Sequence, residues 1–107
     1  MKNVGMKPDT LRSATAGAKF YAPAHCLARI AARDTEKGDP QASARIAGIL
    51  AAKRTDELLP LCHPLPIHAA EVRFTIHDDH VAIAADVHTI GPTGVEMEAL
   101  TAASMAA

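Results

Sequence analysis

Alternation of apolar and polar side chains is clearest over residues 70–88. Every second residue is apolar in 70–76 and again in 81–87, and the polar pair Asp78-Asp79 separates the two runs. A period of two is typical of strands with one buried face and one wet face. The pattern therefore predicts an antiparallel hairpin with strands over 70–77 and 81–88. A weaker alternation over 16–22 predicts a further short strand.

Two helices are predicted between the first strand and the hairpin. The first begins at Pro23, because proline is tolerated at the first helical position, and runs to about Arg33. The second has Asp39 as its N-cap, Pro40 at the next position, and an end near Arg54. Its apolar face is expected to consist of Ala42, Ile46, Ile49 and Leu50.

The segment after the second helix changes character. Residues 55–57 predict a short capped turn, and three prolines within 59–66 exclude a helix and favour extended chain. Residues 91–94 lead into a last helix that runs to the terminus. The order strand-helix-helix-strand-strand-helix predicts an α+β fold with the helices on one face of an antiparallel sheet. The last helix has no glycine or basic stop signal, so we expect the fold to be incomplete at the C-terminus.

Composition narrows the class of protein. A chain of 107 residues predicts one domain, and 23 alanines leave few large side chains for a core, so we expect other subunits or further chain to complete the burial. No apolar run approaches the roughly 20 residues of a membrane span. The net charge of −1 gives no general attraction to nucleic acid.

The chain has two cysteines, Cys26 and Cys62, which are too few for a disulfide scaffold. This cysteine content predicts a cytoplasmic protein.

Basic residues around the second predicted helix are candidates for binding an anion. Lys37 lies just before the helix N-terminus, where the helix dipole is already positive, and a phosphate between the two would favour both. A solvated surface lysine is the alternative. Arg45 and Lys53 share one side of the helix with Ile49. Basic side chains that pack their stems on apolar surface are the ordinary explanation of that stripe.

The string Leu61-Cys62-His63-Pro64 is the most suggestive loop. A histidine held between prolines has the restricted motion that a general acid or base needs, although a structural loop histidine is the alternative. Neighbours on extended chain are expected to point to opposite sides, which argues against a Cys62–His63 dyad or a shared metal. The six histidines show no metal-binding spacing on a helix, and no C-x-x-C is present, so we predict no metal site.

Two glutamates begin the last predicted helix. The string Thr93-Gly94-Val95-Glu96 matches a capping box, in which Glu96 bonds back to the Thr93 backbone. Glu98 lies about 200° around the helix from Glu96. We therefore expect at most one of the two carboxylates to project into any one pocket.

Five strings occur in a telling order: Lys37-Gly38-Asp39, Ala44-Arg45-Ile46-Ala47-Gly48-Ile49, Ala51-Ala52-Lys53-Arg54-Thr55, Pro60-Leu61-Cys62-His63-Pro64-Leu65 and Thr93-Gly94-Val95-Glu96-Met97-Glu98-Ala99-Leu100-Thr101. Together they resemble the molybdenum cofactor biosynthesis protein C (MoaC) family, the cyclic pyranopterin monophosphate synthases. The resemblance implies a single MoaC-like domain over 1–107 with a ferredoxin-like fold. It also implies a homohexamer, a trimer of dimers with active sites at subunit interfaces.

The activity that the resemblance implies is that of a lyase in molybdenum cofactor biosynthesis. Its substrate is a cyclised GTP derivative, 3′,8-cyclo-7,8-dihydro-GTP, its products are cyclic pyranopterin monophosphate and pyrophosphate, and no tightly bound cofactor takes part. Matched position by position, the substrate pocket comprises Leu61, Cys62, His63, Met97 and Glu98. Because the substrate carries a triphosphate, we also expect Arg45 and Lys53 to supply positive charge. The matched catalytic positions are Lys37, Lys53, His63, Glu96 and Glu98.

Within this resemblance, we expect His63 and Glu98 to hold the base while Lys37 and Lys53 handle phosphate and protons. The family continues past the last helix into a stretch with a catalytic aspartate and a lysine, so a chain ending at Ala107 is expected to be C-terminally truncated. Two alternatives stay open. One is an inactive remnant that binds nucleotide phosphates or assembles with a full-length relative, and the other is a generic ferredoxin-like interaction domain.

Overall fold

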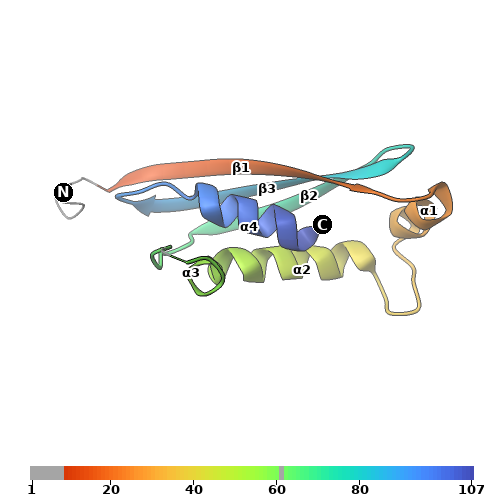
Figure 1. Ribbon diagram of the computed structural model, residues 1–107, viewed down its shortest axis with the longest axis horizontal. Helices are drawn as coiled ribbons and strands as arrows, with labels where there is room; N and C mark the ends of the chain where they lie inside the picture. The colour runs from red at the N-terminus through yellow and green to blue at the C-terminus, as the bar shows by residue number, and fades with distance from the viewer. Residues whose placement is uncertain (1–8, 61) are drawn as a thin grey trace.

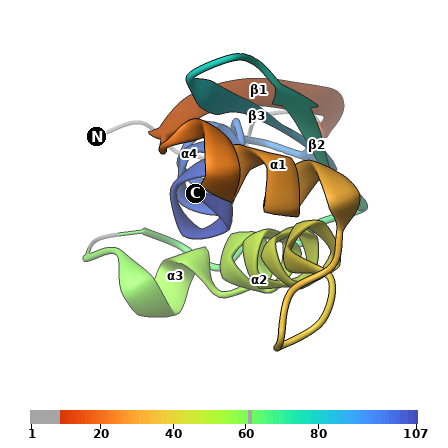
Figure 2. The ribbon, with the colours of Figure 1, turned by 90° about the vertical axis from the view of Figure 1, so that its right-hand side faces the viewer.

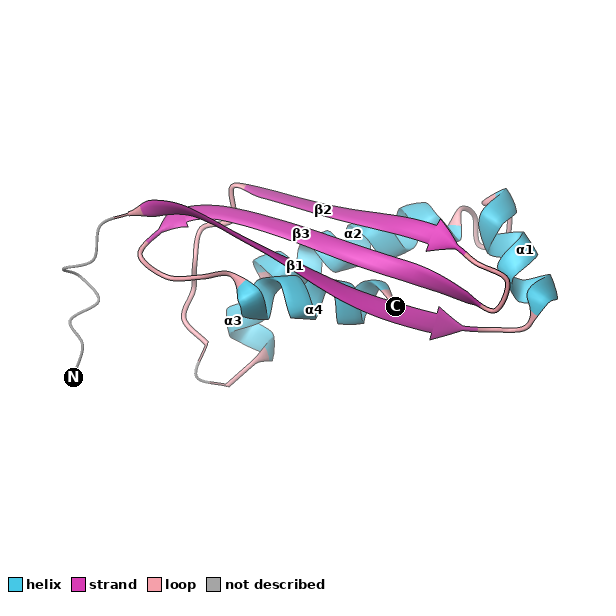
Figure 3. Ribbon diagram, turned by 90° about the horizontal axis from the view of Figure 1, so that it is seen from above, coloured by secondary structure: helices cyan, strands magenta, loops and turns pink. Residues whose placement is uncertain are grey.

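The predicted α+β architecture is confirmed by a computed structural model, which describes residues 9–60 and 62–107. Its strands are β1 (Thr10–Tyr21), β2 (Ala69–Ile76) and β3 (His80–Gly91). Its helices are α1 (Ala24–Ala32), α2 (Pro40–Lys53), α3 (Thr55–Leu58) and α4 (Glu96–Ala106). The helices α2 and α4 lie side by side beneath the sheet (Figures 1 and 2). Seen through the sheet, α1 lies beyond the ends of the strands (Figure 3).

The sheet is antiparallel with the strand order β1-β3-β2, and the hairpin prediction is confirmed. The central strand β3 pairs with β1 along its whole length, from Tyr21 opposite His80 to Thr10 opposite Gly91. The strand β1 is therefore longer than the alternation predicted. The reason is that continuous backbone pairing extends it through Leu11, whose side chain is on the uncovered face and 72% exposed.

The core lies between the inward face of β3 and the helix α4. Val81, Ile83, Ala85 and Val87 are buried on β3, in the alternation that the sequence showed. They meet the buried alanines of α4: Ala99, Ala102, Ala103 and Ala106. Small side chains on the helix let its axis approach the sheet closely, so the core is thin.

The expected apolar face of α2 is correct for Ile49, which packs partly buried against the core, and wrong for Ile46 and Leu50. Ile46 is 60% exposed and Leu50 is 48% exposed, whereas Gly48 is buried against α4. A β-carbon on Gly48 would lie 3.0 Å from the Ala102 carbonyl oxygen and 3.2 Å from the Ala106 Cβ. The two helices thus pack through their smallest residues, and that close approach leaves Ile46 and Leu50 outside.

Both ends of α2 follow their sequence signals. The Asp39 carboxylate accepts hydrogen bonds from the backbone N–H groups of Gln41 (2.9 Å) and Ala42 (3.3 Å), as expected of an N-cap. After α2, residues 55–58 form the predicted short turn of helix. None of the helices in the described part of the chain is long and apolar enough to cross a membrane.

Candidate active site

A cavity of about 250 Å³ opens where the proline-rich segment faces the start of α4. We call it the loop–helix pocket. Its lining residues are Leu59, Pro60, Cys62, His63, Leu65, Thr93, Gly94, Glu96, Met97 and Glu98. Five candidate site residues from two distant parts of the sequence therefore meet here. Leu61, also a candidate, lies outside the described residues.

The proline-rich segment is fastened to the end of β3. The buried hydroxyl of Thr89 donates a hydrogen bond to the Pro66 carbonyl oxygen. The His68 backbone N–H donates to the His88 carbonyl (2.9 Å), and the His68 Nδ1 accepts from the Ile90 N–H (3.2 Å). These bonds fix the chain a few residues after His63, so the imidazole is presented from an anchored loop.

Glu98 is the buried acid of the pocket, with only 3% of its surface exposed. Burial raises the pKa of its carboxyl group, and the negative charges of Glu96 and Asp56 raise it further, against the effect of a hydrogen bond from its own backbone N–H. A carboxyl group in such surroundings is able to hold and release a proton closer to neutral pH than an exposed glutamate can.

Two expectations about the glutamates are wrong. Glu96 and Glu98 both line the pocket, although the helical angle predicted that only one would. The reason is that Glu96 is the first residue of α4 and its carboxylate folds back over Gly94, where a β-carbon would collide with it. The capping box does not form either, because the N-cap of α4 is Val95, which makes no side-chain cap.

Cys62 and His63 both line the loop–helix pocket, which corrects the expectation that they point to opposite sides. The segment turns at Pro60 and is not a regular strand, so adjacent side chains do not alternate strictly. Burial raises the pKa of the Cys62 thiol, and the charges of Glu98 and Asp56 raise it further. Within residues 9–60 and 62–107, no group of three or more His, Cys, Asp or Glu side chains is placed to hold a metal ion.

Lys37 lies in a second, wider hollow of about 630 Å³ at the other end of the sheet. This strand-end pocket is lined by Phe20, Tyr21, Ala22, Pro23, Cys26, Arg29, Ile30, Thr35, Glu36 and Lys37. Tyr21 pairs with His80 at the start of β3, whereas the proline-rich segment is bonded to Thr89 near its end. Nine residues of strand span about 30 Å. One chain therefore does not bring Lys37 to His63.

An anion was expected to bind between Lys37 and the N-terminus of α2, but a side chain of the protein already occupies part of that N-terminus. The Asp39 carboxylate already accepts hydrogen bonds from two of the first free N–H groups of the helix. Arg29, which also lines the strand-end pocket, is the second cation beside Lys37. No sequence signal distinguished it, because a basic residue in the last turn of a helix is explained by the helix dipole alone.

The other two basic candidates lie outside both pockets. The Arg45 Nε donates to the Val72 carbonyl oxygen (3.1 Å), and the Arg45 guanidinium carbon lies 5.6 Å from the centre of the Phe74 ring. Arg45 therefore packs α2 against β2. Lys53 is the exposed last residue of α2, at the same end of the molecule as α3.

Comparison with known sequences gives these pockets a context. Residues 1–107 match the profile of the MoaC family along their whole length. The chain belongs to the MoaC family. A cyclic pyranopterin monophosphate synthase of Roseiflexus sp. (strain RS-1) is 52% identical over 109 residues, which cover all of this chain and 69% of the relative.

Two further MoaC relatives carry the same name. The cyclic pyranopterin monophosphate synthase of Deinococcus radiodurans is 48% identical and that of Streptomyces griseus 47% identical, each aligned with the whole of this chain. The chain spans 64% of the first and 60% of the second. The strings that carried the resemblance thus lie within a match that covers this MoaC chain completely.

Proposed function

We propose that this chain acts in molybdenum cofactor biosynthesis, in the conversion of 3′,8-cyclo-7,8-dihydro-GTP to cyclic pyranopterin monophosphate and pyrophosphate. The observation that carries the proposal is the meeting of His63, Cys62 and Glu98 in one cavity. Rearranging a purine into a pyranopterin requires proton transfers, and the pocket contains a histidine, the commonest general acid or base, together with a buried carboxyl group whose pKa is raised.

In this proposal, His63 and Glu98 bind the base and move protons, while Met97 and Cys62 shape an apolar wall. Cys62 acts as a neutral thiol, since its raised pKa disfavours the thiolate that a nucleophile needs. Lys37 binds the triphosphate together with Arg29, which lines the same hollow. The catalytic assignment of Lys53 and the binding role of Leu61 rest on the resemblance alone. Glu96 also lines the loop–helix pocket, and the binding role of Arg45 rests on its positive charge.

A complete site then needs two copies of the chain, because Lys37 and His63 lie at opposite ends of the sheet. We propose that Lys37 of one copy serves the loop–helix pocket of another, within the family's hexamer of three dimers. The proposed ferredoxin-like family fold agrees with the strand order β1-β3-β2. In that order a further strand has a free edge of β1 on which to pair.

The first experiment measures pyrophosphate release by the purified full chain supplied with the cyclised GTP. We expect release by the parent protein and none by His63→Ala or Glu98→Gln. His77→Ala, which changes an exposed histidine of the hairpin turn, is the matched control and keeps its activity. Substrate binding without turnover by the parent protein would instead support the non-catalytic alternative.

The second experiment tests whether two copies share a site. Lys37→Ala and His63→Ala chains are each inactive in this proposal, but a mixed dimer contains one site with both residues intact. After unfolding and refolding an equal mixture, we expect about one quarter of the parental activity, because half the dimers are mixed and each has one good site of two. No recovery in a mixture that has exchanged subunits would contradict a shared site.

A further inference from the structure

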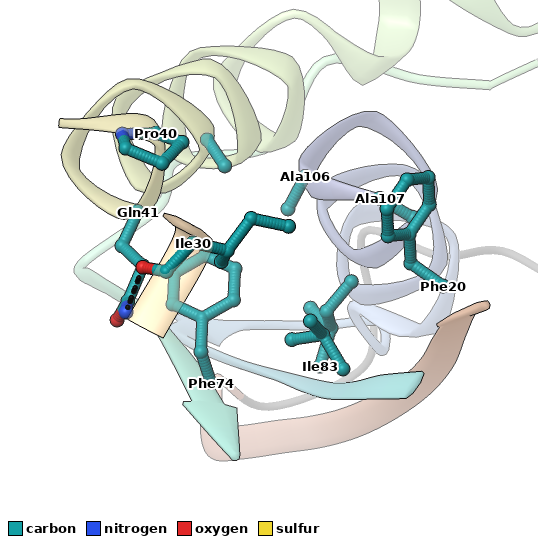
Figure 4. A pocket seen from close by; sticks show the side chains of 10 residues that line it. Phe20, Ile30, Pro40, Gln41, Phe74, Ile83, Ala106 and Ala107 are labelled. Atoms are coloured by element: carbon teal, nitrogen blue, oxygen red, sulfur yellow. Dashed lines mark hydrogen bonds between the residues drawn. The ribbon is translucent and has the colours of Figure 1, made fainter. Parts of the chain in front are cut away.

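Gln41 is a buried amide that joins two helices and both ends of the loop that carries Lys37. It is 9% exposed and lies at the second position of α2. Its Nε2 donates a hydrogen bond to the carbonyl oxygen of Ile30 in the last turn of α1 (3.0 Å), the bond drawn in Figure 4. Its Oε1 accepts a hydrogen bond from the Arg33 guanidinium (3.0 Å).

On one side, Gln41 faces apolar groups. Gln41 borders a cavity of about 180 Å³, and the other described residues lining that cavity are apolar: Phe20, Ile30, Pro40, Ala44, Phe74, Val81, Ile83, Ala106 and Ala107 (Figure 4). A hydrogen bond is stronger and more costly to break in such surroundings than in water. A leucine there would leave the Arg33 guanidinium and the Ile30 carbonyl without these two bonds, so the amide fixes how the end of α1 meets the start of α2.

Arg33 is the second residue that joins α1 to α2; we call Gln41, Arg33 and Asp39 together the clamp. Its backbone is left-handed (φ 58°), a conformation that is strained for a residue other than glycine. Its guanidinium bonds Gln41 and also lies 3.7 Å from the Asp39 carboxylate. The strained residue that ends α1 is thereby tied to the capping residue that begins α2.

The loop between these anchors is itself closed. Thr35 and Gly38 exchange backbone hydrogen bonds of 3.0 and 2.9 Å, and the Thr35 hydroxyl donates to the Gly38 carbonyl (2.7 Å). Gly38 has a φ of 107°, which only glycine adopts easily. Glu36 and Lys37 therefore form the tip of a tight turn whose base is fixed by Arg33, Gln41 and Asp39.

We propose that Gln41 is a positioning residue for Lys37. Through its bond to Arg33 and through the turn, Gln41 holds the lysine at the rim of the strand-end pocket. This inference rests on the proposed function, which assigns phosphate binding to Lys37. Arg33→Gly and Gln41→Met release the clamp by different routes. The first also relieves the left-handed strain, and the second keeps the length of the side chain.

The binding test uses inorganic pyrophosphate and calorimetry on the full chain. We expect Gln41→Met and Arg33→Gly to weaken binding about fivefold or more, and to cause no further loss in a Lys37→Ala background. Gln41→Glu keeps the acceptor for Arg33 and is expected to recover part of the affinity. Ser43→Ala, on the exposed side of α2, is the control. Parental affinity in the clamp variants, or an equal loss without Lys37, would overturn the proposal.

A second measurement separates this inference from the proposed function. Hydrogen exchange of the Thr35 and Gly38 amides, which donate the two backbone hydrogen bonds that close the turn, needs no ligand. We expect it to be about tenfold faster in Gln41→Met and Arg33→Gly, with the exchange of β3 unchanged. If the parent chain does not bind pyrophosphate, the phosphate role of Lys37 fails while this readout still decides the clamp. Unchanged exchange in both variants would refute it.

Discussion

Adding one methyl group at Gly48 is expected to destabilise the fold, although the same change at an exposed helical position would stabilise it. The new β-carbon of Gly48→Ala would lie 3.0 Å from the Ala102 carbonyl oxygen, 3.1 Å from Val72 Cγ2 and 3.2 Å from Ala106 Cβ. One of these neighbours is backbone, so the contact is relieved only if α4 moves away from α2.

Two opposing effects set the size of the change. Alanine is favoured over glycine inside a helix by about 1 kcal/mol, and an extra methyl group in a well-packed core costs about 1–3 kcal/mol. With a packing cost near 2 kcal/mol, we expect Gly48→Ala to lower the free energy of unfolding by about 1 kcal/mol. We take the middle of the range for the packing cost because the new methyl group would be too close to three atoms at once.

Urea denaturation followed by circular dichroism measures the difference. The matched controls are Ser43→Ala and Ser43→Gly, at an exposed position of the same helix, whose difference reports helix propensity alone. Subtracting it from the Gly48→Ala result leaves the packing cost. If Gly48→Ala were as stable as the parent or more so, the close α2–α4 contact would not limit packing, and this reasoning would be refuted.

Two further predictions concern the loop–helix pocket. Glu98→Gln should raise the free energy of unfolding at neutral pH. The pKa of Glu98 is raised in the folded chain above its ordinary value of 4.5, so the unfolded chain loses this proton first as the pH rises. The parent protein therefore loses stability above pH 4.5, and the glutamine variant does not. Denaturation curves should show this gain shrinking to nothing below that pH. Glu98→Gln should also speed alkylation of Cys62 by iodoacetamide at pH 8, since the Glu98 charge raises the pKa of that thiol; mass spectrometry of the labelled peptide measures the rate, and an unchanged rate would contradict it.

The hairpin and the start of α2 could be predicted because their signals are local. Alternation over 70–88 reports directly which face of the sheet is covered, and Asp39-Pro40 places a cap and a compatible residue at the helix start. The face of α2 that packs inward could not be predicted from hydrophobicity. Gly48, Ala51 and Ala52 lie inward because the separation of the helices selects for size, and that separation is a property of the whole helix layer.

The candidate site was predictable as a set of residues but not as an arrangement. Sequence spacing gave no reason to bring Glu96 and Glu98 to one cavity, since the fold-back of Glu96 over Gly94 depends on where α4 begins. It gave equally little indication that Lys37 lies at the far end of the sheet from His63. Chain order does not report distance along a strand, and β3 carries the chain between the two ends.

The small-residue contact between α2 and α4 links the fold to the proposed chemistry. Glu98 lies one turn before Ala102, on the same buried side of α4, so the position of its carboxyl group follows that of the helix axis. His63 is held instead by β3, through Thr89. The distance between the two groups is therefore set by how closely α4 packs on the sheet and on α2. A displacement of about 1 Å is enough to cost a catalytic site on the order of 100-fold in rate. Gly48 and the alanines facing it thus act on the geometry of a pocket that they do not line.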